Sequence, residues 1–297
     1  MVKVGCPDYV ENVLWDTGLK VGDYYYLLNQ DTNQIIQMEL ETDDGVLFGV
    51  NEAKEYKFYD EVLDEVSGSY SIKGKLDIST ADQGHQIGRT DYNLVVTSYN
   101  EFDGTYPIAV QMINENLEIT NSYNRSRCDG VAWDGTRIFI LATSDIIIFD
   151  NDLNYRGFIG ITSNDDSTCV VKDGYLWTGE WWYSQLRKRN VNDLRDVLLN
   201  INMPGGIKGL YLWDDYLLVM SREVSSIPNT YFTKLNPDNG WILKQKFYNV
   251  DNVENVITLE DTFVFLDKWF SYIVQKDTDL NTIQSNYSTL VGLCKIE

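Results

Sequence analysis

The stretch that decides the fold of this chain runs from Val131 to Ile161 and holds four short apolar runs joined by polar turns. In order, the runs and turns are Val131-Ala132-Trp133-Asp134-Gly135, Arg137-Ile138-Phe139-Ile140-Leu141, Ile146-Ile147-Ile148-Phe149-Asp150, Asn151-Asp152-Leu153-Asn154 and Gly157-Phe158-Ile159-Gly160-Ile161. Each apolar run has the length and the β-branched and aromatic content of a strand. A unit of four strands that recurs about every forty residues is typical of a β-propeller blade.

Two series of turns recur along the chain with this same period. The turn between the first two runs has copies at Arg89-Thr90-Asp91, Trp133-Asp134-Gly135, Lys172-Asp173-Gly174, Trp213-Asp214-Asp215 and Leu259-Glu260-Asp261. The turn after the third run has copies at Asn114-Glu115-Asn116-Leu117, Asn151-Asp152-Leu153-Asn154, Asn192-Asp193-Leu194-Arg195, Pro237-Asp238-Asn239-Gly240 and Asp277-Thr278-Asp279-Leu280-Asn281. Asp-Gly between apolar runs favours a hairpin, because glycine tolerates the positive φ that a tight twisted turn requires. The two series together predict an all-β fold, a β-propeller with blades of four strands.

The number of blades depends on the N-terminal region. Residues from about Gln86 to Ser288 supply five units. We predict one further blade that begins at Val13-Leu14-Trp15-Asp16 and has Ile35–Met38 and Gly45–Val50 as its outer strands. A shorter blade is expected between Asn51 and Ser79, with strands near Tyr56–Tyr59 and Ser69–Lys73. These assignments predict seven blades, and the alternative is six blades with an N-terminal appendage.

The C-terminal run Leu290–Ile296 is strand-like and is left over after the units are counted. We expect it to pair with the N-terminal blade and to close the ring, which removes the open edge of the sheet. No linker rich in Pro, Gly or Ser interrupts the repeat, so residues 1–297 are interpreted as one domain. No apolar run is long enough for a membrane span, and the start at Met1 lacks the apolar segment of a signal peptide.

Charge and residue inventory exclude several classes of function. The formal net charge of -21 disfavours nucleic-acid binding, because phosphate contacts need clustered Lys and Arg. Charged partners are therefore expected to be cationic surfaces or metal ions. His85 is the only histidine and is expected in a loop before a strand. No phosphate-binding loop is present either, so no cofactor and no transition-metal site are expected.

The four cysteines form no C-x-x-C pair. They are Cys6, Cys128, Cys169 and Cys294. Free thiols that pack as small apolar groups are the first interpretation of Cys169 and Cys294, and a disulfide between Cys6 and Cys294 across the ring closure is the alternative. The segments Asp150–Asn154 and Asp277–Asn281 resemble the start of a calcium loop but lack its Gly and Glu, so they are expected to be hairpin turns.

One face of the predicted propeller gathers aromatic and acidic residues. The loops between second and third strands emerge on the same side as the loops between blades, and together they form this face. The candidate binding residues there are Tyr99, Phe102, Glu180, Trp181, Trp182, Tyr183, Asp267, Trp269 and Phe270. Aromatic rings beside acids suit a protein interface or a sugar site. The alternative is that Trp181, Trp182 and Trp269 pack between blades.

The chain resembles the β-propeller superfamily of NHL, YVTN and quinoprotein-type repeats. The Asp-Gly turn and the strand rhythm carry this resemblance, which covers residues 86–288 well. The Trp-Asp pairs at 15–16, 133–134 and 213–214 fall in the inner hairpin, the turn between the first and second strands of a unit. They lack the Gly-His partner of WD40 repeats. No catalytic residue of any propeller family can be transferred to this chain.

The preferred hypothesis is a non-enzymatic propeller that binds other proteins of a larger assembly through its loop-rich face. A chain rich in Asn, Ile and Tyr and poor in Ala suits an AT-rich genome, and a virus or phage virion is the leading example of such an assembly. The alternative is a glycan-binding protein or a glycosidase. A glycosidase needs two carboxylates across the funnel, and the candidates are Glu101, Asp103, Glu180 and Asp267.

Overall fold

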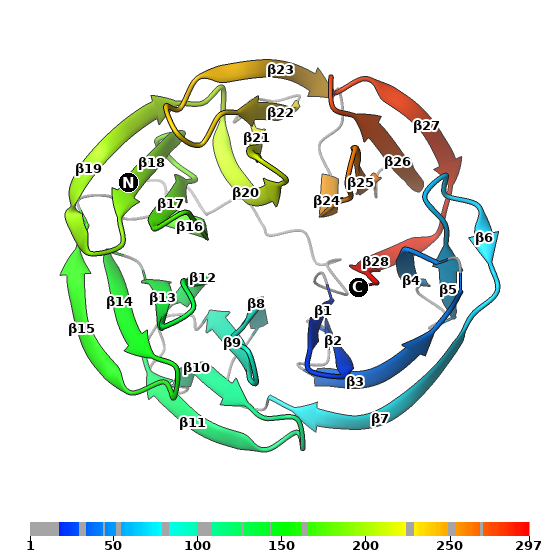
Figure 1. Cartoon of the computed structure of the whole chain (residues 1–297), viewed down its shortest axis with the longest axis horizontal. Helices are drawn as coiled ribbons and strands as arrows, with labels where there is room; N and C mark the ends of the chain where they lie inside the picture. Colours follow the sequence, from blue (N-terminus) through cyan, green and yellow to red (C-terminus); the bar gives the residue numbers. More distant parts are fainter. Residues whose placement is uncertain are drawn as a thin grey trace, which may run out of the picture.

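The chain is an all-β propeller with seven blades. The computed structural model describes residues 18–296 except for 30–33, 44, 52–54, 79–82, 100–107, 126–127, 143, 162–165, 224–228, 249–252 and 268–269. In this part of the chain 28 strands form seven antiparallel sheets of four strands each. The sheets surround a central axis like blades (Figure 1). The predicted fold and blade number are confirmed, and the six-blade alternative is wrong.

Blades 2 to 6 each consist of four consecutive strands. Blade 2 contains β8 (Gln83–Arg89), β9 (Leu94–Tyr99), β10 (Ile108–Ile113) and β11 (Ile119–Asn124), and blade 3 contains β12 (Cys128–Trp133), β13 (Arg137–Ala142), β14 (Asp145–Asp150) and β15 (Tyr155–Gly160). Blade 4 contains β16 (Asp166–Lys172), β17 (Tyr175–Glu180), β18 (Gln185–Asn190) and β19 (Asp193–Asn202). Blade 5 contains β20 (Gly206–Trp213), β21 (Tyr216–Arg222), β22 (Thr230–Leu235) and β23 (Ile242–Tyr248), and blade 6 contains β24 (Val253–Thr258), β25 (Thr262–Asp267), β26 (Tyr272–Asp277) and β27 (Thr282–Tyr287).

Blades 1 and 7 share the N-terminal region and exchange strands. Blade 1 has the order β1 (Leu19–Val21), β2 (Tyr24–Asn29), β3 (Gln34–Glu41) and β7 (Ser69–Asp77). Blade 7 has the order β28 (Leu290–Lys295), β4 (Leu47–Asn51), β5 (Tyr56–Tyr59) and β6 (Glu65–Val66). The chain therefore leaves blade 1 after β3, builds three strands of blade 7, and returns to blade 1 as its outer strand. Figure 1 shows this excursion from β3 to β7 at the lower right of the ring.

This exchange corrects the predicted division of the N-terminal region. Gly45–Val50 was expected to be an outer strand of the first blade, but β4 is the second strand of blade 7. Ser69–Lys73 was expected to belong to the shorter blade, but β7 pairs with β3 over eight residues of β3. The expected closure by the C-terminal run is confirmed, because β28 pairs with β4. The segment Val13–Asp16 lies outside the described residues.

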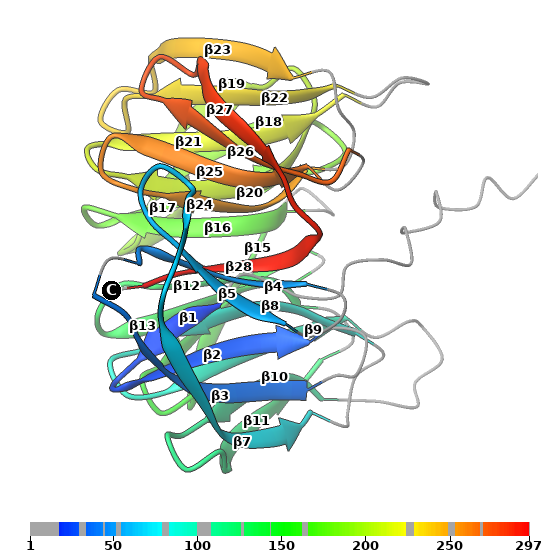
Figure 2. The same ribbon diagram turned by 90° about the vertical axis from the view of Figure 1, so that its right-hand side faces the viewer.

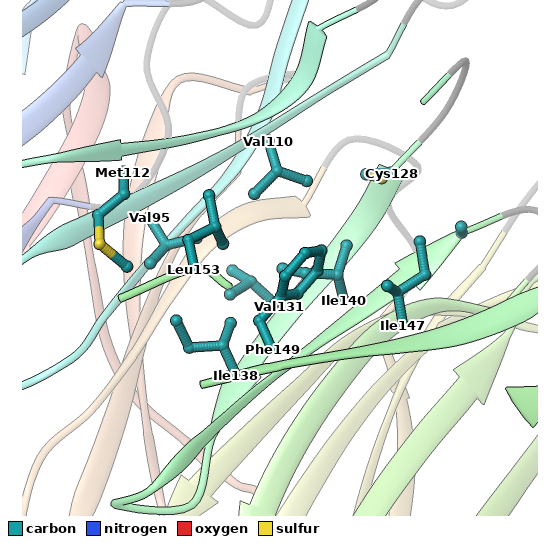
Figure 3. Close-up of a cluster of buried hydrophobic side chains, with 11 residues drawn as sticks. Val95, Val110, Met112, Cys128, Val131, Ile138, Ile140, Ile147, Phe149 and Leu153 are labelled. Carbon is teal, nitrogen blue, oxygen red and sulfur yellow. The ribbon is translucent and has the colours of Figure 1, made fainter. Parts of the chain in front are cut away.

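The ring is held by seven apolar clusters, one in each interface between neighbouring blades. Figure 3 shows the cluster between blades 2 and 3, to which Val95, Val110 and Met112 come from blade 2. Blade 3 supplies Phe149 and Leu153 to the same cluster. Burial of each such side chain contributes about 1.5–3 kcal/mol. The core is thus divided among the interfaces, and in inner strands such as β2 and β13 alternate residues face opposite neighbouring blades.

The outer hairpin of a blade joins its third and fourth strands. Four of these outer hairpins share an unusual turn in which a leucine adopts a left-handed conformation. These leucines are Leu63, Leu117, Leu153 and Leu280, with φ of 58°, 59°, 59° and 61°. Each follows an Asp or Asn whose Oδ1 accepts hydrogen bonds from two backbone N–H groups of the same turn. A left-handed conformation costs a non-glycine residue about 1–2 kcal/mol. The cost is offset because each leucine side chain packs into the cluster shared with the neighbouring blade.

Side chains of one blade donate hydrogen bonds to backbone carbonyls in the outer hairpin of the next blade. In ring order from blade 1 the pairs are Gln37 with Glu115, Asn121 with Asp152, Arg137 with Val191, Lys188 with Pro237, Lys234 with Thr278, and Gln275 with Glu61. Lys188 and Lys234 also lie over the rings of Tyr175 and Tyr216, at 4.0 and 3.7 Å from the ring centroids. Six of the seven interfaces are therefore bridged in one pattern, and the seventh is bridged by the chain excursion.

Three smaller expectations can also be compared with the structure. His85 lies within β8 rather than in a loop, because a bulge between Gly84 and Gln86 carries the strand past it. Asp150–Asn154 and Asp277–Asn281 form hairpin turns as predicted. Cys128, Cys169 and Cys294 are buried, and burial beside Asp129 raises the pKa of the Cys128 thiol to about 12. Cys6, the other half of the alternative disulfide, lies outside the described residues.

Candidate functional site

The two faces of the ring are built from different connections. Inner and outer hairpins, between strands one and two and between strands three and four, lie on one face, which we call the hairpin face (Figure 2). The connections between strands two and three and between successive blades lie on the opposite face, which we call the loop face. The seven candidate residues that the structure describes belong to connections of the loop face or to the strand ends beside them.

The connection of blade 4 begins at Glu180, the last residue of β17. This carboxylate is fully buried, and its Oε2 lies 3.1 Å from Nη2 of Arg187 on β18. Apart from this ion pair, neither carboxylate oxygen has a hydrogen-bond partner among the described residues. Burial of a charged pair is costly unless the partners stay together. Glu180 is therefore held inside the blade, away from solvent.

Trp181 is half-buried and packs against Gly206, the first residue of β20 in blade 5. A Cβ at Gly206 would lie 2.9 Å from the indole of Trp181, so only glycine leaves room for the ring. Lys208 Nζ lies 5.9 Å from the centre of the same ring. These contacts support the alternative of interblade packing for this tryptophan.

Trp182 and Tyr183 differ from Trp181, because both face solvent. Their side chains are 47% and 67% exposed. Ser184 then takes a positive φ of 55°, and its carbonyl accepts a hydrogen bond from Met203 N at 2.7 Å. The end of the loop is thus held against the connection to blade 5, while the two aromatic side chains are displayed.

The connection of blade 6 has the same plan. It begins at the buried Asp267, whose Oδ1 accepts a hydrogen bond from Phe270 N at 3.1 Å and whose Oδ2 accepts one from Tyr248 OH at 3.3 Å. Burial, with the charge and hydrogen bond of Asp267, raises the pKa of Tyr248 to about 12. Phe270 is 54% exposed, and Ser271 repeats both the positive φ and the backbone hydrogen bond of Ser184.

The two loops can therefore be aligned as Glu180-Trp181-Trp182-Tyr183-Ser184 with Asp267-Lys268-Trp269-Phe270-Ser271. An acid is followed two residues later by Trp, then by an exposed aromatic residue and a left-handed serine. Sequence reasoning chose the aromatic residues without this correspondence, although the shared acid, Trp and Ser are visible in the sequence. It also missed Arg187 and Tyr248, the partners of the two acids.

The structure brings some candidate residues together and separates others. Trp181, Trp182 and Tyr183 share one loop, whereas Phe270 lies on blade 6, with blade 5 between the two loops. The two acids are separated as well, because Glu180 pairs with Arg187 of its own blade 4, whereas Asp267 of blade 6 accepts a hydrogen bond from Tyr248 of blade 5. Tyr99 is the last residue of β9. Phe102, Trp269 and the glycosidase candidates Glu101 and Asp103 lie outside the described residues.

The described part of the chain was also compared with two other kinds of site, a hollow and a metal centre. A hollow of about 500 Å³ lies on the hairpin face of blades 1 and 7, and its lining includes Lys20, Asp23, Glu41 and Asp43. Among the described residues no group of three or more His, Cys, Asp or Glu side chains is arranged to hold a metal ion. No helix long and apolar enough for a membrane crossing occurs in this part of the chain.

Comparison with known proteins finds similar structures but no similar sequence. No protein-family model matches the sequence, and no curated protein sequence matches it. The WD40 domain of Pan2 from Neurospora crassa superposes with a TM-score of 0.62 and 10% identity, covering 98% of this chain and 82% of that domain. A putative 6-phosphogluconolactonase from Bacteroides fragilis superposes with a TM-score of 0.61 and 11% identity, covering 95% of this chain and 97% of that protein.

A chain of the nidogen–laminin complex is also similar, with a TM-score of 0.58 and 13% identity, covering 84% of this chain and 97% of that one. These identities are too low to transfer an activity. The names of the three proteins are unrelated although all three share one architecture, as expected of a fold that hosts many functions. The comparisons therefore establish this chain as a β-propeller.

Proposed function

We propose that this chain is a non-enzymatic propeller that binds partner proteins of a larger assembly through its loop face. The observation that carries this proposal is the paired display of aromatic side chains on blades 4 and 6. Trp182, Tyr183 and Phe270 are exposed, whereas the acids that begin the same loops are buried. The chemistry offered to a ligand by these described residues is therefore aromatic.

Aromatic side chains suit protein recognition for a physical reason. They supply a large apolar area with few rotatable bonds, and tyrosine and tryptophan add one hydrogen-bonding group. Residues of this kind dominate the binding energy of many protein interfaces. Two similar loops separated by one blade give two anchor points on one rigid ring, which limits the orientations that a bound partner can adopt.

The buried acids weigh against the glycosidase alternative. A glycosidase acid must meet its substrate and have a second carboxylate about 5–9.5 Å away across the sugar. Glu180 is paired with Arg187, and Asp267 accepts hydrogen bonds from Tyr248 and Phe270. Among the described candidate residues, the two acids thus stabilise their loops, and the exposed Trp182, Tyr183 and Phe270 are the binding groups.

The nidogen–laminin structure offers a parallel, because its similar chain was solved in a complex between two proteins. This parallel supports the class of function only. The kind of assembly is part of the proposal, and a virus or phage particle is the example that the composition suggests.

The experiment is site-specific crosslinking followed by affinity measurement. A photoreactive phenylalanine analogue replaces Tyr183 or, as the control, Tyr92, which is 79% exposed in an inner hairpin of the hairpin face. We expect one protein to crosslink to position 183 and not to position 92. With that protein purified, Trp182→Ala and Phe270→Ala should each weaken binding about 30-fold, the scale of a hot-spot residue.

Two results would contradict a protein interface on the loop face. If position 183 crosslinks no protein, or if both alanine variants bind the crosslinked protein as tightly as the wild type, the interface is elsewhere. If the same variants lose binding to oligosaccharides on a glycan array to which the wild type binds, the loop face is a sugar site.

A further inference from the structure

The outer strands of blades 4 and 5 expose an unusually apolar surface. Six of its side chains are large, hydrophobic and exposed, and we call this set the blade 4–5 rim: Val197, Leu198, Trp241, Ile242, Leu243 and Phe247. The rim lies on the outer circumference of the ring, along β19 and β23 (Figure 1). It is therefore distinct from the loop face and from the proposed function.

The two strands form one continuous surface. A Cβ at Gly240, in the turn before β23, would lie 2.8 Å from Cδ1 of Ile201 and 3.0 Å from Cδ1 of Leu199, both on β19. Blade 5 thus packs closely against the outer strand of blade 4 at this point. The apolar residues of both strands can be covered by a single partner.

The polar residues of β23 are already engaged within the ring. Lys244 Nζ lies 3.4 Å from Asp279 Oδ1, and Lys246 Nζ donates a hydrogen bond to Asn281 Oδ1. Gln245 donates a hydrogen bond to Thr233 Oγ1 at 2.9 Å. Besides these engaged polar side chains, β23 exposes Ile242, Leu243 and Phe247, and Phe247 is 65% exposed.

The rim also coincides with the one sector that is not acidic. Blades 4 and 5, residues 166–248, contain 10 Lys and Arg against 9 Asp and Glu, a net charge of +1. The whole chain has 24 against 45, so the remaining residues carry 14 against 36, a net charge of -22. Two copies of such a protein repel one another unless they approach through blades 4 and 5. An acidic partner would gain little from a sector that is only neutral.

The backbone of β23 can itself take part in pairing. β23 is the last strand in the sheet of blade 5, so its outer side pairs with no other strand of the described residues. Edge strands of this kind are templates for pairing with a further strand, and charged or bulged residues usually protect them. A two-fold axis through such an edge sets two copies of the same strand antiparallel.

From these observations we propose that a second copy of this chain occupies the blade 4–5 rim, with β23 of one copy beside β23 of the other in an isologous dimer. The aromatic and aliphatic side chains of the rim are buried between the copies. The acidic sectors point away from one another. Because the dimer axis lies at the circumference, both loop faces stay free for their partners.

The test is the oligomeric state of the purified chain, measured by analytical ultracentrifugation. We expect a dimer that dissociates when Phe247→Glu or Trp241→Glu is introduced, with a dissociation constant raised at least 100-fold, since each substitution occurs twice in an isologous interface. Dimerisation should strengthen as ionic strength rises from about 20 to about 200 mM, because salt screens the repulsion between the acidic sectors.

The matched control is Phe158→Glu on β15 of blade 3, whose ring is 58% exposed on the outer strand of an acidic sector. It should dimerise like the wild type. A monomeric wild type, a dimer that survives both rim substitutions, or a dimer lost equally in Phe158→Glu overturns the proposal. Open-ended growth with concentration also overturns it, because an isologous contact closes after two copies. Circular dichroism verifies that the variants are folded.

Discussion

The hairpin face and the loop face of this propeller differ in how strictly their connections repeat. On the hairpin face, four turns share one plan with a left-handed leucine that packs into an apolar cluster, and hydrogen bonds bridge six of the seven interfaces. On the loop face, the connections between second and third strands range from two residues after β13 to eight after β9. The repeated hydrogen bonds between blades thus lie on the hairpin face, whereas the connections of the loop face differ in length from blade to blade.

The same difference suggests where function lies. Connections on a rigid scaffold can change sequence without loss of the fold, and binding residues gather on such connections. Exposed aromatic side chains of blades 4 and 6 fit this role, since their loops are held by a buried acid at one end and a backbone hydrogen bond at the other. If so, substitutions on the hairpin face should mainly change stability, and substitutions of exposed loop-face residues should mainly change binding.

The largest effect is expected at the left-handed leucines of the hairpin face. Leu280→Ala should reduce the free energy of unfolding by about 2–5 kcal/mol, because it leaves a cavity between blades 5 and 6. Leu280→Gly should be no less stable than Leu280→Ala, since glycine relieves a left-handed strain of about 1–2 kcal/mol. Urea denaturation of both variants measures the difference.

Leu266, buried within β25, is the control for this order. There the glycine variant should be less stable than the alanine variant by about 0.5–1 kcal/mol, as in any regular strand. The same order at Leu280 would show that its backbone is not left-handed, and the account of the hairpin face would then be wrong.

An intermediate effect separates the adjacent tryptophans of the loop face. Trp181→Ala should cost about 2 kcal/mol of stability, roughly half the value for a fully buried tryptophan, because the ring packs over Gly206. Trp182→Ala should change stability by no more than about 0.5 kcal/mol, as at other exposed positions. Thermal unfolding of the two variants makes the comparison. Equal losses would mean that Trp182 is a packing residue and that the loop face lacks this anchor.

The sequence allowed the fold to be predicted because the turns carry local chemistry. Asp-Gly and Asx turns specify hairpins from a few adjacent residues. The division of blades 1 and 7 was missed because strand exchange depends on long-range pairing that no local signal encodes. One signal was available: Asp60-Glu61-Val62-Leu63-Asp64 has the outer-turn pattern of Asp150–Asn154, which marks β5 and β6 as the third and fourth strands of one blade.

The candidate site was predicted less completely than the fold. Residue type alone identified Trp181 and Trp182 together, but only the neighbouring Gly206 shows that one ring packs and the other is displayed. In the same way Glu180 and Asp267 are acids in an exposed-looking loop, and their burial depends on Arg187 and Tyr248 from other strands. No sequence motif links Glu180 to Arg187 or Asp267 to Tyr248, so these partners could not be predicted from the sequence.

The smallest effect is expected from Asp150, in the outer hairpin of blade 3. Although burial opposes its charged form, hydrogen bonds from Asn154, Asp152 and Arg156 lower its pKa to about 2. The carboxyl group binds a proton more readily in the unfolded chain, so its contribution is complete above the ordinary pKa near 3.8 and is lost as pH falls through about 2. Asp150→Asn keeps an acceptor for the turn, as Asn114 does in blade 2.

At neutral pH, Asp150→Asn should therefore lower the free energy of unfolding by no more than about 1 kcal/mol, and the difference from wild type should shrink between about pH 4 and pH 2. Denaturation midpoints across this range measure it. Asp277→Asn should behave alike, because hydrogen bonds from Asn281 and Asp279 also lower the pKa of Asp277 against the effect of burial. A constant difference at all pH values would mean that these turns are held by their backbone alone, and that the carboxylates of the hairpin face are interchangeable with any acceptor.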